Sequence, residues 1–252
     1  MPKSPPATPF DADPLEIARQ LSLQTFDIFS SIQPSELFHQ AWLNPKLQHK
    51  APNILKLIAS FNYVANWVST SIVSESKVKN RAKIFSKHIK LAQALLQLQN
   101  FHMLMAVVSG LNNSAVLRLK WTKSKMNKRY EQIFIDIEKL CSMEGSWKAI
   151  RTAITMAVPP RIPYIGIYLA DLLFIDEGNP DFVEEHLINF EKRKLVHQIL
   201  QKIEESQKIG YNFVRVPDIE KVLQELPQSD EKDMYAKSLI CEPRNSTKKD
   251  IA

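Results

Sequence analysis

The chain has 252 residues, 44% of them hydrophobic and 24% charged, a composition typical of a soluble globular protein with one large domain or two small ones. Its five glycines do not cluster, which excludes the glycine-rich phosphate loops of P-loop kinases and Rossmann dehydrogenases. Cys141 and Cys241 lie far apart, without the paired spacing of a zinc or redox motif. The opening MPKSPPATPF lacks the apolar core of a secretory signal, and no apolar stretch is long enough to span a membrane. We therefore expect a cytoplasmic protein.

The net charge of +6 raises the question of nucleic-acid binding, which requires a concentrated basic face. Basic residues instead alternate with acids along most of the chain, and the densest basic run, Lys120 to Arg129, is short. We interpret this run as a solvated helix face, with weak attraction to an anionic membrane surface as the alternative. No nucleic-acid partner is expected.

Helix signals begin near the start of the chain. Residues 1–10 are proline-rich and predicted to be disordered. Asp13 and Pro14 then provide a capping acid and a first-turn proline for a helix. A second helix is expected after Pro34, with Ser35 as its cap and Leu37 and Ala41 at helical spacing. Apolar residues at a period of 3.6 predict three more helices, over 54–68, 81–98 and 101–111, the last buried on all sides.

The segment PPRIPYIGIYLADLLFIDEGNPDF, from Pro159, predicts a helix over about 164–176 that is apolar on every side. Such a helix must be buried all round, either inside its own fold or against a partner. A stop signal follows at 176–180, and a second amphipathic helix is predicted over about 189–206. Together they indicate a helical hairpin, for which an ordinary buried hairpin is the alternative. We predict a single all-α domain, with a mobile tail over 244–252.

No covalent or metal chemistry is evident. The six histidines form no H-x-x-x-H pair with a carboxylate at ligand spacing, and there is no G-x-S-x-G elbow. We expect neither a bound metal nor a cofactor. The four tryptophans are interpreted as core or rim anchors.

Motifs along the whole chain resemble the catalytic domain of the Ras-type guanine nucleotide exchange factors. They are DPLEIARQLSL (13–23), IQPSEL with QAW (32–42), APNILKLI with FNYVANWV (51–68), NFHMLMAVVSGLNNSAVLRL (100–119), the hairpin with LINFEKRK (159–194) and YAKSLICEP (235–243). The resemblance covers about residues 11–243 in order, and this collinearity is more specific than any single motif.

The resemblance implies a function in which no covalent bond is made or broken. Family members insert the hairpin beside the nucleotide site of a small GTPase, push its first switch loop away and release GDP. Leu173 would project toward the magnesium site, and Glu177 would lie near the α-phosphate. Asp171, two residues before Leu173, would hydrogen-bond to the partner. Leu173 and Glu177 are i and i+4, so both can point from one helix face.

The resemblance also places six residues at the GTPase, each with a core or rim role as the alternative: Trp42, Ile58, Met105, Asn112, Trp147 and Tyr164. Tyr164, Ile58 and Met105 would wall the pocket for an aromatic residue of the second switch, with Trp147 nearby. The expected partner is a Ras-subfamily GTPase, bound most tightly when nucleotide-free, and the protein is expected to be a monomer.

The chain departs from the family pattern at three positions. Ala170 stands where threonine is frequent, Ala59 where one member has a basic residue, and Arg161 where the residue is often small. The first ten residues also leave no room for the N-terminal helical exchanger domain of many members, so we expect either a stand-alone catalytic unit or a fragment. A scaffold of the same fold that grips a GTPase without exchanging its nucleotide remains the alternative, although the presence of both Leu173 and Glu177 argues against it.

Overall fold

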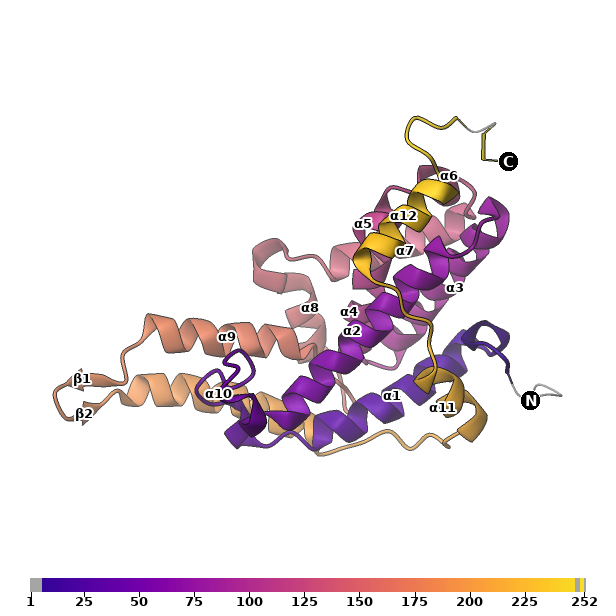
Figure 1. The fold of residues 1–252 in the computed structure, drawn as a ribbon. Coiled ribbons are helices and arrows are strands. Elements are labelled where there is room, and N and C mark those ends of the chain that lie inside the picture. Colours follow the sequence, from indigo (N-terminus) through magenta and orange to yellow (C-terminus); the bar gives the residue numbers. More distant parts are fainter. Residues whose placement is uncertain (1–5, 248–249, 252) are drawn as a thin grey trace.

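Helices joined by short loops make up almost all of the computed structural model, which describes residues 6–247 and 250–251 (Figure 1). The all-α prediction is confirmed. The α-helices are α1 (Pro14–Ser30), α2 (Pro52–Val73), α3 (Val78–Gln97), α4 (Phe101–Leu111), α5 (Ser114–Leu117), α6 (Lys120–Ser124), α7 (Lys128–Leu140), α8 (Glu144–Met156), α9 (Ile165–Gly178), α10 (Phe190–Gln207), α11 (Pro217–Gln224) and α12 (Glu231–Cys241). Short 3-10 turns cover Pro9–Asp11, Pro34–Leu37 and Gln48–Lys50, and the strands β1 (Phe182–Glu184) and β2 (Leu187–Ile188) form one small antiparallel pair.

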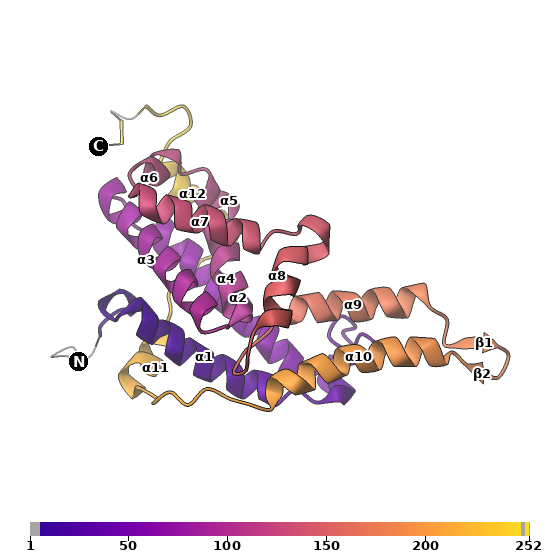
Figure 2. The same ribbon diagram turned by 180° about the vertical axis from the view of Figure 1, so that it is seen from behind.

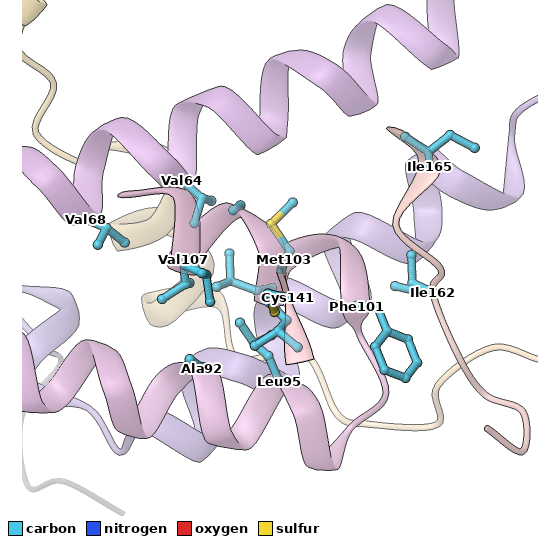
Figure 3. Packing of buried hydrophobic residues seen from close by; sticks show 14 of the residues in the cluster. Val64, Val68, Ala92, Leu95, Phe101, Met103, Val107, Cys141, Ile162 and Ile165 are labelled. Atoms are coloured by element: carbon cyan, nitrogen blue, oxygen red, sulfur yellow. The ribbon is translucent and has the colours of Figure 1, made fainter. Parts of the chain in front are cut away.

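The central helix α4 lies between α2 and α3, and nearly all of its side chains are buried, as its apolar sequence predicts. Figure 3 shows Val64 and Val68 of α2 facing Met103 and Val107 of α4. At Gly110 the two helices approach so closely that an added Cβ would lie 2.4 Å from the carbonyl oxygen of Ala65. This close approach packs α2 and α4 tightly together, and several of the residues considered below lie on these two helices.

The helix expected after Pro34 is wrong beyond the first turn. Residues 34–37 form a 3-10 turn, and His39 and Gln40 then adopt left-handed φ values of 56° and 51°. The cause is Glu36, whose buried carboxylate accepts hydrogen bonds from the backbone N–H groups of Asn53 (2.8 Å) and Ile54 (3.1 Å). Because the Glu36 carboxylate caps the start of α2, residue 36 is held at that helix and the turn begun at Pro34 does not continue as a helix.

A two-helix hairpin projects from the body of the molecule, with β1 and β2 at its tip (Figures 1 and 2). Its arms α9 and α10 begin and end within about two residues of the predicted bounds. The tip strands were not predicted from the sequence. At the neck, the nearly buried Lys192 ammonium bridges the carboxylates of Asp176 (2.8 Å) and Asp181 (3.1 Å) and thereby ties the arms together.

Both ends of the described chain contact the body. Phe10, in the stretch predicted to be disordered, stacks its ring on Trp67 with centroids 5.9 Å apart, and residues 1–5 of that stretch lie outside the described residues. In the tail expected to be mobile, the Ser246 carbonyl accepts a hydrogen bond of 3.1 Å from the Trp121 indole. Residues 248–249 and 252 lie outside the described part. In the part that is described, no helix is long and apolar enough to cross a bilayer.

Two buried histidines predict a pH dependence of stability. Burial lowers the pKa of His88 to about 3 and that of His102 to about 4, so both are neutral in the folded protein. An unfolded chain binds protons at these positions below about pH 6.5, and each histidine should therefore cost roughly 2 kcal/mol of stability at about pH 5. Stability is thus expected to fall as the pH falls from 7 to 5.

Urea unfolding of a His88→Gln variant at both pH values measures this effect. The variant should lose part of the pH dependence, whereas the same change at the exposed His197 should leave it intact. An unchanged pH dependence in His88→Gln would show that this histidine is not the source.

Candidate functional site

The helix α9 changes character half-way along. Its first half packs into the core through Ile165, Leu169 and Leu172, whereas Phe174, further along, is 69% exposed. The sequence predicts a helix buried on every side, and the contacts of α9 within this chain bury only part of it. An apolar surface left open on a projecting helix is suited to contact with a partner.

Leu173 and Glu177 lie on this projecting half of α9. Leu173 is half-buried and Glu177 is exposed, in the last turn of the helix. Among the described residues, no hydrogen bond or ion pair engages the Glu177 carboxylate, in contrast to Asp176 beside it, which is bound by Lys192 and Gln40. The Glu177 side chain is thus exposed and free to act on another molecule.

Tyr164, the residue just before α9, belongs to an aromatic cluster with Phe61 of α2 and His102 of α4. The ring centroids of Tyr164 lie 5.8 Å from Phe61 and 6.1 Å from His102, and those of Phe61 and His102 are 5.4 Å apart. Partial burial raises the pKa of the Tyr164 phenol. Gly166 makes room for the ring, because a Cβ there would lie 2.5 Å from it.

Four of the predicted GTPase contacts share one property: Ile58, Met105, Trp147 and Tyr164 are half-buried hydrophobic side chains packed on the edge of the core. Each is anchored yet keeps part of its surface open. Asn112, at the C-terminal cap of α4, has a buried Oδ1 with no hydrogen-bond partner among the described residues. Because that oxygen is buried, a donor of another molecule can reach it only if the Asn112 side chain turns outward, and the contact of Asn112 with a GTPase stays a prediction.

Trp42 has a different environment, because only 6% of its surface is exposed. It lies beneath a hollow of about 300 Å³ that is also lined by Leu172 of α9 and by Lys192 and Leu200 of α10. The indole therefore supports the base of the hairpin, and its contact with a GTPase stays a prediction.

Asp171 is already engaged within the chain. Both of its carboxylate oxygens accept hydrogen bonds of 2.7 Å from the Arg151 guanidinium of α8, and Arg151 Nε donates to the Ser146 carbonyl at 2.8 Å. Ser146 and Trp147 have left-handed φ values of 56° and 61°. Arg151 thus joins the strained turn that carries Trp147 to the helix that carries Leu173.

Sequence reasoning did not single out Phe61, His102 or Arg151. Phe61 follows Ile58 by three residues on α2, and His102 precedes Met105 by three on α4, so helical spacing from the chosen residues could have indicated both. No such signal exists for Arg151, because its partner lies on another helix. In the described ranges no group of three or more metal-ligating side chains is arranged to hold an ion.

Comparison with known proteins identifies the family. The model of the RasGEF domain matches residues 16–194. The chain belongs to the RasGEF domain family. Its relatives include Ras guanine nucleotide exchange factors J, I and A of Dictyostelium discoideum, which are 43%, 42% and 40% identical to it. Each alignment covers 96% of this chain. It covers 30% of the length of factor J, 29% of factor I and 42% of factor A. The RasGEF match includes α9 and the start of α10, while the chain spans less than half the length of each of these relatives.

Proposed function

We propose that this chain is a guanine nucleotide exchange factor that binds a Ras-subfamily GTPase and opens its nucleotide site with the α9–α10 hairpin. The observation that carries this proposal is the pair Leu173 and Glu177, one turn apart on the projecting half of α9, where the Glu177 carboxylate has no partner among the described residues. The names of the related exchange factors support the same activity.

The two side chains act without breaking or forming covalent bonds. Leucine has no oxygen to offer a hard cation, so Leu173 at the magnesium position disfavours the bound ion. The Glu177 carboxylate repels the departing phosphate and competes for the donors that hold it. Both effects stabilise the nucleotide-free state of the GTPase, which this protein binds most tightly. By reciprocity, a nucleotide that binds the GTPase weakens the binding of this protein.

The GTPase is held by the half-buried side chains Ile58, Met105, Trp147 and Tyr164, with Phe61 and His102 behind the Tyr164 ring. The Asn112 amide, whose buried Oδ1 has no hydrogen-bond partner among the described residues, turns outward to accept a hydrogen bond from the GTPase. The protein acts as a monomer in the cytoplasm and is drawn to membranes by its net charge of +6.

Release of a fluorescent GDP from a panel of Ras, Rap and Ral GTPases tests the proposal. Catalytic amounts of the chain should accelerate release from at least one of them, and each tenfold acceleration corresponds to about 1.4 kcal/mol taken off the barrier. Binding to a GTPase without acceleration would instead identify a non-exchanging scaffold.

Arg151 should matter for exchange although it touches neither nucleotide nor metal. In Arg151→Met, the turn carrying Trp147 and the helix carrying Leu173 lose their common tether, and we expect release to slow by about tenfold. The loss of stability should be small, about 1 kcal/mol, because both partners are about one-third exposed.

Stopped-flow GDP release and melting temperature are measured together for this variant. Arg161→Met, which removes bonds to the carbonyls of Ile154 and Ala157 at the other end of α8 and a bond to the Ser206 hydroxyl of α10, is the control that leaves the Asp171 tether in place. Equal slowing in both variants would mean that general loosening of α8, and not the Asp171 tether, is responsible.

A further inference from the structure

Four lysines follow one face of α3. Lys79, Lys83, Lys87 and Lys90 are spaced by four, four and three residues, on the side of the helix opposite the buried Phe85. Like charges at this spacing repel one another and destabilise a helix, so this arrangement is not one that helix stability favours.

The lysines surround a hollow between α3 and the start of α7. Its volume is about 390 Å³, within the range of small-ligand sites, and Lys125 from the loop after α6 closes it from the other side. Its floor is largely apolar, with Ala82, Met126 and Tyr130. We refer to this hollow, lined by Lys79, Lys83, Lys87, Lys90 and Lys125, as the lysine hollow.

No carboxylate lines the lysine hollow, and none of its lysines takes part in an ion pair recorded among the described residues. Glu131, the residue after Tyr130 on α7, is exposed outside it. Two of the ammonium groups have other neighbours: Lys87 donates to the Phe10 carbonyl at 2.7 Å, and Lys90 lies 5.2 Å above the Tyr130 ring. The remaining three present unneutralised charge to the hollow, and a multiply charged anion would relieve their repulsion.

We propose that the lysine hollow binds a multiply phosphorylated headgroup, such as a phosphorylated inositol ring. Several phosphates on one small ring can face several ammonium groups at once, whereas the Tyr130 and Met126 floor suits the ring itself. In Figure 2, α3 and α7 lie at the end of the molecule away from the hairpin tip, so both sites can be occupied together. The inference gives the proposed membrane association a defined site, and it does not depend on exchange activity.

Three probes test the site in the absence of any GTPase. Soluble inositol hexakisphosphate is titrated by calorimetry, and vesicles of phosphatidylcholine with phosphatidylinositol bisphosphate are compared with phosphatidylserine vesicles of equal total charge. We expect binding to the soluble probe and to the bisphosphate vesicles, weakened by salt, and clearly weaker binding to phosphatidylserine. Tighter binding to vesicles than to the soluble probe would identify a lipid as the source, and the reverse a free phosphate.

The double variant Lys83→Gln, Lys125→Gln should weaken binding of both phosphorylated probes about tenfold or more. Lys221→Gln, Lys232→Gln, on α11 and α12 outside the hairpin, changes the net charge equally at exposed positions and should bind like the unmodified protein. GDP release in solution should be the same for all three proteins. Equal weakening in both double variants, equal binding to phosphatidylserine, or tighter binding of duplex RNA than of either phosphorylated probe would overturn the proposal.

Discussion

Tyr164→Ala is expected to weaken binding to a nucleotide-free Ras-subfamily GTPase by about 2 kcal/mol or more, roughly thirtyfold in the dissociation constant. The Tyr164 ring is half-buried, supported by Phe61 and His102 and seated over Gly166, so it is fixed in place before a partner arrives. An aromatic anchor that needs no ordering on binding contributes strongly to affinity. Surface plasmon resonance on the immobilised nucleotide-free GTPase measures the loss.

Tyr164→Phe is the matched control. No hydrogen bond of the Tyr164 hydroxyl is recorded among the described residues, so the phenylalanine variant should keep most of the affinity if the ring is what the partner contacts. If Tyr164→Ala keeps its affinity while its melting temperature falls, Tyr164 is only a core residue and the contact assignment is wrong.

Glu177→Ala should slow GDP release by about tenfold or more while the affinity for the nucleotide-free GTPase changes little. The Glu177 carboxylate acts on the phosphate of the bound nucleotide. Affinity for the GTPase comes instead from Tyr164 and from side chains on α2, α4 and α8. The helix should survive, because alanine is the best helix former and Glu177 lies in the last turn of α9.

The exposed Glu185, between the tip strands, provides the matched control, because Glu185→Ala removes the same charge from the same hairpin. Stopped-flow release should be normal in Glu185→Ala and slow in Glu177→Ala. Normal rates in both would mean that the Glu177 carboxylate plays no part and that the hairpin acts by bulk alone. Leu173→Ala is harder to interpret, since truncating a half-buried leucine also costs stability.

The helices could be predicted where one face is buried in a regular period. The stripe on α2 and the almost wholly apolar sequence of α4 gave their positions within about five residues, because burial against the core dictates residue type along most of the helix. The hairpin arms could be predicted equally well, because the stop signal after Asp176 and the cap at Asn189 depend only on residues close by in the sequence. The apolar periods and local caps thus predict the helices, and the resemblance to the exchange-factor family then assigned roles to them.

Features that depend on contacts distant in the sequence could not be predicted. The turn at His39 and Gln40 follows from Glu36 capping α2, a contact across a loop. Arg151 reaches Asp171 between two helices, a contact that neither helix signals in its own sequence, and the predicted contact of Asp171 with a partner stays a prediction. The lysines of α3 were overlooked for a related reason: they are spread along the sequence, and only the folded chain brings them beside Lys125.

The behaviour of the complex in the presence of nucleotide tests the central claim most directly. The chain and a nucleotide-free Ras-subfamily GTPase should co-elute on size exclusion as a stable complex, and excess GDP or GTP should dissolve it, because nucleotide and exchange factor each weaken the binding of the other. A complex that persists unchanged in millimolar nucleotide would contradict an exchange mechanism and would leave a GTPase-binding scaffold in its place.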